Sequence, residues 1–253
     1  MPLQSHGSPL VSVIMPCWNG SNTIASAIRS IQEQTFTDWE LLVADDGSND
    51  GSRTIVKKLS TVDQRIKLVS HGEGRSGAAA ARNRALQAST GRYIAFLDVD
   101  DQWLPEKLAV QICAMEEHSS SFSCTGYWVK RRGKLDILRT PPPIITREIL
   151  LRGNRIGCLT AIYDSQILGK QAMPDIPLRQ DYALWCRLLT LTDSALGISQ
   201  PLAIHHRTSK SLSSNSFLAS IATWQMFRKE AGLNKRKATL SLCSHLLGRI
   251  FRG

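Results

Sequence analysis

The sequence predicts an α/β fold with a mostly parallel central sheet covered by helices on both faces. Short apolar runs alternate with segments of helical periodicity over residues 11–117, which is the pattern of successive strand–helix units. Two of those runs end directly in clusters of aspartate, and ligands of parallel sheets bind beyond the carboxyl ends of the strands. Of the 253 residues, 42% are hydrophobic and 21% are charged, which fits one or two globular domains.

The first half of the chain contains four predicted strands, and a predicted helix follows each of them. The apolar runs that predict strands are Val11–Met15, Glu40–Ala44, Ile66–Ser70 and Tyr93–Leu97. The segments that predict helices are Asn22–Gln34, Ser52–Leu59, Ala78–Ser89 and Pro105–Glu117.

After about Ser119 the strict alternation ends. Residues 122–130 and 134–138 resemble two antiparallel strands, and Pro141–Pro143 predicts a stiff linker. The remaining predicted elements are a helix over Asp181–Leu191, a strand over Ala195–His205, and helices over Asn215–Ala231 and Lys237–Phe251. We therefore expect a main domain over residues 1–215 and a helical extension over residues 216–253.

That extension is strongly basic. The net charge of the chain is +10, and residues 228–253 contain seven basic residues against one acid, Glu230. Leu242, Leu246, Leu247 and Ile250 recur there at helical spacing, as in helices that lie on anionic membrane surfaces. A helix packed on the body of the protein is the alternative. Nucleic-acid binding is not predicted, because the extension offers only Phe251 for stacking on bases.

Other features of the chain indicate a cytoplasmic protein, with peripheral contact at the inner face of the plasma membrane. The six cysteines form no Cys-x-x-Cys pair and lie in apolar segments, which predicts buried thiols and a reducing compartment. Residues 1–9 do not resemble a signal peptide. No stretch approaches the ~20 apolar residues that a spanning helix needs.

Two acidic clusters follow predicted strands. In Asp45-Asp46-Gly47-Ser48, a carboxylate could accept hydrogen bonds from a nucleoside, or it could cap the next helix. In Asp98-Val99-Asp100-Asp101, mutual repulsion of the carboxylates favours a bound cation such as Mn²⁺ or Mg²⁺. A solvated acidic loop is the alternative for this second cluster.

Three further side chains are candidates for chemistry. Arg82 lies one turn into a predicted helix and could bind phosphate, or it could be an exposed arginine. Asp181 begins a predicted helix and could be a general base or an N-cap. His206, at the end of a predicted strand, could ligate the metal or be an exposed histidine.

A dinucleotide-binding site is a competing interpretation. Residues 72–77 fit the pattern G-x-G-x-x-G, and Asp98 follows 21 residues after Gly77. This interpretation, an NAD(P)-binding oxidoreductase, leaves Asp46 and Asp100 unexplained, and such a fingerprint normally opens its fold.

Several segments together resemble the inverting family-two glycosyltransferases with a GT-A fold, over about Pro9 to Asn215. Each segment alone is weak evidence for the family, but all of them together, in this order and spacing, are specific to it. They are Val11–Asn19, Gln34–Phe36, Asp45–Ser52, Ala81–Asn83, Phe96–Asp101, Asp181–Trp185 and Ser211–Asn215.

The resemblance implies an enzyme of bacterial polysaccharide biosynthesis that transfers a sugar with inversion from a nucleotide-sugar, most simply a UDP-sugar. The acceptor would be a glycan or a lipid-linked saccharide, and Asp181 would be the catalytic base. The metal ligands would be Asp98 and Asp100, with His206 as a third. The residues that would bind the nucleotide-sugar are Pro16, Trp18, Asn19, Asp46, Arg82 and Asp98. A binding protein without catalysis is the remaining alternative.

The sequence departs from the family pattern at three of these places. The histidine near the end of the module, His206, does not align cleanly with the family's histidine. Gln180 stands where a glutamate is usual before the catalytic aspartate, and Trp18 stands where tyrosine is commoner.

Overall fold

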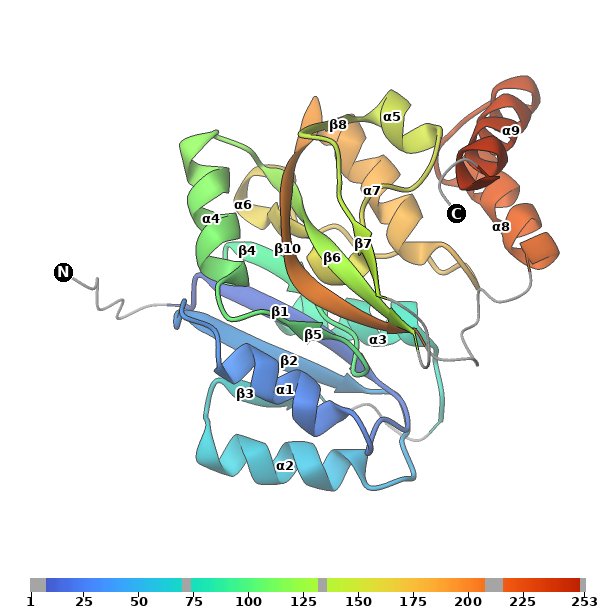
Figure 1. Ribbon diagram of the computed structural model, residues 1–253. Helices are drawn as coiled ribbons and strands as arrows, with labels where there is room; N and C mark the ends of the chain where they lie inside the picture. The colour runs from blue at the N-terminus through green and yellow to red at the C-terminus, as the bar shows by residue number, and fades with distance from the viewer. Residues whose placement is uncertain (1–7, 70–73, 132–135, 208–215, 251–253) are drawn as a thin grey trace.

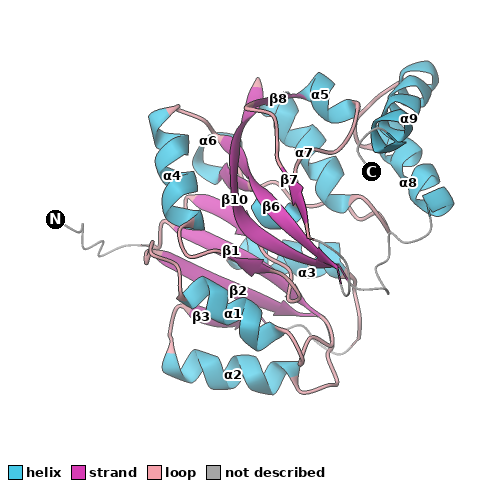
Figure 2. Cartoon of the chain, in the orientation of Figure 1, coloured by secondary structure: helices cyan, strands magenta, loops and turns pink. Residues whose placement is uncertain are grey.

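The computed structural model describes residues 8–69, 74–131, 136–207 and 216–250 (Figure 1). One large sheet runs through the molecule, and helices lie on both of its faces (Figure 2). The predicted α/β architecture is confirmed. Among the described residues, no helix has the length and apolar character needed to cross a membrane.

Four strands from the first half form the parallel part of the sheet in the order β3-β2-β1-β4. Their bounds are β1 Val11–Cys17, β2 Trp39–Asp45, β3 Ile66–Val69 and β4 Tyr93–Phe96. The helices between and after them are α1 Ile24–Gln32, α2 Ser52–Val62, α3 Ala78–Ala88 and α4 Lys107–Glu117. All eight elements lie where the periodicity predicts them, with ends shifted by a few residues.

The second half extends this sheet through a short antiparallel strand, β9 (Ile162–Asp164), which pairs with β4 on one side and β6 (Phe122–Arg131) on the other. The long strand β10 (Ser194–Arg207) is parallel to β6. Three short strands pair antiparallel with these two: β5 Gln102–Trp103, β7 Ile137–Arg139 and β8 Ile144–Thr146. The antiparallel pair predicted near residues 122–138 is confirmed.

Six short elements were not predicted. Besides β5, β8 and β9, they are α5 Arg147–Leu151, the 3₁₀ turn η1 Cys158–Thr160 and α6 Ser165–Leu168. None exceeds five residues, so none is long enough to show a periodic pattern.

The core has two halves, one on each face of the sheet. Within β1, Val13 and Met15 pack with α1, α2 and α4, whereas Ile14 packs on the opposite face with α3 and α7 (Gln180–Leu191). Side chains of a strand alternate between faces, so a strand buried on both sides is apolar at nearly every position. This explains why β1 and β2 read as continuous apolar runs.

The C-terminal helices α8 (Ser216–Lys229) and α9 (Lys235–Ile250) lie beside α7 (Figure 1). Phe227 of α8 is fully buried, and its ring contacts Tyr182 of α7 with centroids 5.7 Å apart. Met226, Leu233 and Ala238 join the same core cluster. The extension therefore shares a core with the main domain. The boundary placed at residue 215 lies outside the described residues.

Candidate active site

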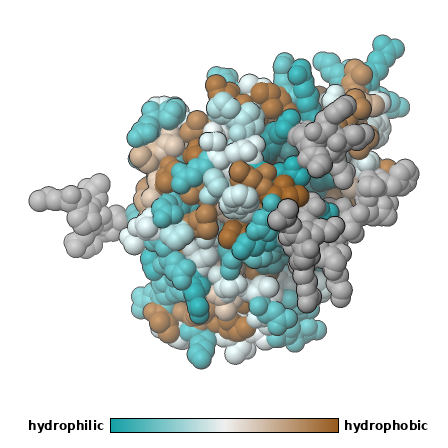
Figure 3. All heavy atoms as spheres, in the orientation of Figure 1, coloured by the Kyte–Doolittle hydropathy of each residue, from teal (hydrophilic) through white to brown (hydrophobic). Residues whose placement is uncertain are grey.

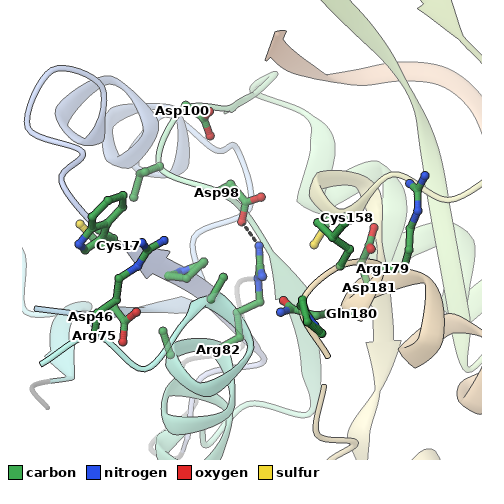
Figure 4. Close-up of a pocket in the computed structure, with 17 residues that line it drawn as sticks. Cys17, Asp46, Arg75, Arg82, Asp98, Asp100, Cys158, Arg179, Gln180 and Asp181 are labelled. Atoms are coloured by element: carbon green, nitrogen blue, oxygen red, sulfur yellow. Dashed lines mark hydrogen bonds and ion pairs between the residues drawn. The ribbon is translucent and has the colours of Figure 1, made fainter. Parts of the chain in front are cut away.

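A pocket of about 470 Å³ opens at the carboxyl ends of β1, β2 and β4 and reaches the start of α7. It brings together residues that lie far apart in the sequence, as Figure 4 shows. The lining residues that bear on the chemistry are Pro16, Cys17, Trp18, Asp46, Arg75, Arg82, Asp98, Asp100, Cys158, Arg179, Gln180 and Asp181.

At one end of the pocket, Trp18 presents its ring. Its side chain is 45% exposed, and the Arg75 guanidinium stacks over the ring at 3.6 Å from its centroid. Asn19 is not among the lining residues; its Oδ1 accepts a hydrogen bond from the backbone N–H of Asn49 at 3.0 Å. Asn19 thus holds the turn after β2, and its contact with a nucleotide-sugar stays a prediction.

Asp46 is buried and bonded to the loop that precedes α3. Its carboxylate accepts hydrogen bonds from the backbone N–H groups of Ser76 (2.9 Å) and Gly77 (2.7 Å) and from Arg84 (3.2 Å). Burial opposes ionisation, but these donors prevail and lower the pKa of Asp46. Gly47 allows the turn here, because its φ is +80° and a Cβ would meet Gly74 O at 3.0 Å.

This arrangement contradicts the dinucleotide interpretation. In such a fingerprint the glycine-rich backbone faces a pyrophosphate. Here the N–H groups of Ser76 and Gly77 donate to the Asp46 carboxylate instead. Residues 72 and 73 of the pattern lie outside the described residues.

Arg82 and Asp98 form an ion pair in the middle of the pocket. The Arg82 Nη2 donates to Asp98 Oδ1. Burial alone would lower the pKa of Arg82, but the adjacent Asp98 carboxylate raises it. The Arg82 side chain is only 10% exposed, so the alternative of an exposed helix arginine is wrong. The Asp98 side chain remains 33% exposed to the pocket.

The next two carboxylates in the chain have different surroundings. Asp100 lines the pocket, and burial together with the neighbouring charge of Asp98 raises its pKa. Asp101 points away to β10, where it accepts hydrogen bonds from the His205 ring and from the His206 backbone N–H, both at 3.0 Å. Burial raises the pKa of Asp101 to about 6.

His206, predicted as a metal ligand, is not brought into the pocket. Its Nε2 lies 3.2 Å from Gln102 Oε1, and burial lowers its pKa. The imidazole ring that contacts Asp101 of the acidic loop is that of its neighbour His205, whereas His206 contacts Asp101 only through its backbone N–H. Within the described part of the chain, no three His, Cys, Asp or Glu side chains form a ready cluster for a metal ion. Asp98 and Asp100 still offer the hard oxygen ligands that Mn²⁺ and Mg²⁺ prefer.

Asp181 lies at the other end of the pocket, in the first turn of α7. The N-cap of α7 is Arg179, with φ 69°, so Asp181 is not the capping residue. Burial raises the pKa of Asp181, although the charges of Arg82 and Arg179 lower it in part. A carboxylate with a raised pKa is a stronger base and can accept a proton from a hydroxyl.

Arg75, Cys158 and Arg179 line the pocket but were not predicted as site residues. Arg75 and Arg179 stand in loops without regular periodicity, and Cys158 begins the unpredicted turn η1. Arg179 is only two positions from Asp181, and this proximity was the signal in the sequence that could have identified Arg179 as a pocket residue.

Comparison with known proteins supports one family throughout. Residues 12–166 match the family described as glycosyl transferase family 2. The teichuronic acid biosynthesis glycosyltransferase TuaG of Bacillus subtilis is 40% identical over 237 residues, which cover 93% of this chain and 94% of that protein. The Escherichia coli enzyme WfgD, named UDP-Glc:α-D-GlcNAc-diphosphoundecaprenol β-1,3-glucosyltransferase, is 38% identical over 86% of this chain and 85% of its own.

Solved structures agree on the fold. TarS 1–349 of S. aureus, solved in complex with UDP-GlcNAc, has a TM-score of 0.74 at 19% identity, covering 93% of this chain and 71% of that one. The mannosyltransferase PcManGT of Pyrobaculum calidifontis, solved with GDP-Man and Mn²⁺, has a TM-score of 0.67 at 20% identity, covering 96% and 72%. The chain is therefore a glycosyltransferase with the GT-A fold and belongs to glycosyl transferase family 2.

Proposed function

We propose that this enzyme transfers a sugar, with inversion and with a divalent metal ion, from a UDP-sugar to a hydroxyl of a lipid-linked saccharide. One observation carries the proposal: a single pocket joins an exposed aromatic ring, an acidic pair and a half-buried aspartate. In that order, these are the parts needed to hold the nucleobase of the donor, its diphosphate with a metal ion, and the hydroxyl of the acceptor.

The end of the pocket at Trp18 fits a nucleoside. The exposed ring offers a flat surface for a base, and Asp46 and Pro16 line the pocket next to it. Because Asp46 is already bonded to Ser76 and Gly77, it also fixes the loop that carries Arg75. A UDP donor is supported by the UDP-GlcNAc complex of TarS and by the name of WfgD.

The middle of the pocket fits a diphosphate and a metal ion. Asp98 and Asp100 would hold Mn²⁺ or Mg²⁺, and the complex of PcManGT with Mn²⁺ supports this cofactor. The bound ion would neutralise charge on the departing diphosphate. Arg82, paired with Asp98, fixes that carboxylate and adds positive charge beside the diphosphate. His206 as a third ligand remains a prediction.

Asp181 performs the proton transfer in this scheme. It takes the proton of the acceptor hydroxyl as that oxygen bonds to the anomeric carbon of the donor sugar. The bond from the anomeric carbon to the diphosphate oxygen breaks in the same displacement, and the nucleoside diphosphate leaves with both electrons. Attack from the side opposite the leaving group inverts the anomeric centre.

A screen of UDP-, GDP- and TDP-sugars tests the function. We expect a UDP-sugar with Mn²⁺ to protect the protein against thermal unfolding, because a ligand that binds only the folded state stabilises it. We also expect acceptor-dependent release of UDP. Protection by NADH but by no nucleotide-sugar would contradict the proposal, and binding without any release of UDP would indicate a non-catalytic binding protein.

The C-terminal helices support contact with a membrane, where a lipid-linked acceptor is found. The outward face of α9 carries Leu240 (68% exposed), Cys243 and Leu247 (54% exposed). These residues follow one another at helical spacing, and exposed Lys235, Arg236 and Lys237 precede them. Leu242, which the sequence placed on the membrane face, is partly buried against the core instead. We propose that the exposed face rests on an anionic bilayer.

Substituting this face should release the protein from vesicles. The double variant Leu240→Glu, Leu247→Glu should bind anionic phosphatidylglycerol vesicles at least about tenfold more weakly in a sedimentation assay, because two apolar side chains leave the bilayer. The matched control is Val62→Glu, Ile167→Glu, which makes the same change at two exposed apolar residues on α2 and α6. Equal binding of both variants would contradict the proposed face. Truncation after Gly232 is a poorer test, because buried Leu233 and Ala238 would be lost.

A further inference from the structure

Arg179 lines the pocket beside the proposed base but has no place in the chemistry described above. In the view of Figure 4, Asp181 lies between Arg82 and Arg179. Arg82 serves the donor half of the pocket through Asp98. Arg179 lines the pocket at the start of α7, together with Asp181.

The guanidinium of Arg179 is held at one nitrogen, because its Nε donates to Thr223 Oγ1 of α8 at 3.2 Å. Its two terminal amino groups have no hydrogen-bond acceptor among the described residues. Among the residues that the structure describes, no carboxylate forms an ion pair with Arg179. A guanidinium fixed at one nitrogen with its other donors unused is suited to a phosphate oxygen.

A second arginine, Arg155, also lacks an ion pair among the residues that the structure describes. It lies in the loop before η1, and its buried Nε has no hydrogen-bond acceptor there. The charges of Arg179 and Arg155 both act to lower the pKa of Tyr182, although burial dominates and raises it. A guanidinium without a carboxylate partner favours an anionic ligand.

We propose that Arg179 binds the diphosphate of a sugar-diphospho-lipid acceptor and so presents the acceptor sugar to Asp181. The inference rests on the proposed function and names its acceptor subsite. Only Gln180 separates Arg179 from Asp181, so their Cα atoms lie at most about 7.6 Å apart, and both side chains line the pocket. A single acceptor sugar would place its hydroxyl at Asp181 and its anomeric diphosphate at the guanidinium.

The lipid end of such an acceptor would then point toward the C-terminal helices. Thr223, which holds Arg179, belongs to α8, and α8 packs against α9 (Figure 1). The exposed leucines of α9 belong to the same helical pair. One unit of structure thus connects the proposed membrane face to the proposed diphosphate subsite.

Binding of a lipid diphosphate without any sugar tests this subsite directly. The protein is first saturated with UDP and Mn²⁺ so that the donor half is filled, and this titration tests the proposed function by itself. Farnesyl diphosphate and farnesol are then titrated as probes. We expect farnesyl diphosphate to bind at least about tenfold more tightly than farnesol, without displacing UDP, and Arg179→Ala to remove that difference.

Two further variants sharpen the result. Thr223→Val should weaken farnesyl diphosphate binding less than Arg179→Ala does. It removes only the hydrogen bond that holds the guanidinium of Arg179, and the guanidinium itself remains. Arg152→Ala, at an exposed arginine after α5, should leave binding unchanged. Equal affinity for farnesyl diphosphate and farnesol, displacement of UDP by the probe, or full binding by Arg179→Ala would each overturn the subsite. Normal UDP binding in that case would leave the proposed function intact.

Transfer kinetics separate this role from an effect through Asp181. Arg179 also lowers the pKa of Asp181, so Arg179→Ala should shift the acid limb of kcat for every acceptor. The subsite predicts an additional rise in KM, at least about tenfold, only for acceptors that carry the diphosphate. A KM that rises equally for a neutral alkyl glycoside of the same sugar would contradict the proposal.

Discussion

Asp181→Asn should reduce kcat at least about 100-fold while the affinity for UDP and Mn²⁺ stays within about twofold of the wild type, since removal of a general base costs ~10²–10⁴ in rate. The amide keeps the shape of the side chain but cannot accept the proton. The loss belongs to kcat because the proton moves only in the transition state. Gln180 cannot replace Asp181 as the base, because its side chain is an amide. The Nε2 of Gln180 donates to the Ile176 carbonyl at 2.7 Å.

The matched control is Asp175→Asn, the same change at an exposed aspartate six residues earlier. It should have normal turnover. If Asp181→Asn also had near-normal turnover with a small loss of thermal stability, Asp181 would be structural and the base would lie elsewhere.

The pH profile gives a second readout of the same residue. Only the ionised carboxylate can act as base, and burial raises the pKa of Asp181 above its ordinary value. Activity of the wild type should therefore fall as the pH drops through this raised pKa, at a higher pH than an ordinary aspartate near 3.9 would give. The residual activity of Asp181→Asn should lack this acid limb.

Asp100→Ala should abolish detectable turnover because one of the two proposed metal ligands is lost. Excess chelator should have the same effect on the wild type. Mn²⁺ together with UDP should raise the Tm of the wild type but not that of the variant. Asp136→Ala, at an exposed aspartate outside the pocket, is the control and should be fully active. Full activity of the wild type in excess chelator would contradict the metal site.

The fold should survive the loss of Asp100. Burial and the charge of Asp98 raise the pKa of Asp100 in the folded state, so its ionised form is less favourable there than in the unfolded chain. A raised carboxylate pKa means that stability is lost as the pH rises through it. Removing the carboxylate should therefore leave the Tm at neutral pH, without metal, unchanged or higher. A Tm well below that of the wild type would show that lost activity reflects unfolding.

The sequence alone determined the parallel strands β1 to β4 and the residues that line the pocket at their carboxyl ends. β1 and β2 are buried on both faces, so nearly every residue contributes to an apolar signal, apart from Ser12 and Glu40, which hydrogen-bond to each other. The aspartates that follow mark the ends of strands β2 and β4. The placement of Asp46, Asp98 and Asp100 in one pocket was predictable, because parallel strands bring their carboxyl ends to the same edge of the sheet. The placement of Arg82 at this pocket was predictable from its position one turn into α3.

Only the tertiary structure decided which residues surround Asp181 and which face of α9 is exposed. Arg179 contacts Thr223, 44 residues later, and Asp101 contacts the ring of His205, 104 residues later. Helical spacing predicted an apolar stripe at Leu242, Leu246, Leu247 and Ile250. Packing of Ala238 and His245 against the core buries Leu242 in part and leaves Leu240 and Leu247 exposed. Local periodicity reports which residues share a face, but the partner of that face depends on contacts between distant segments. Those contacts form only when the chain is folded.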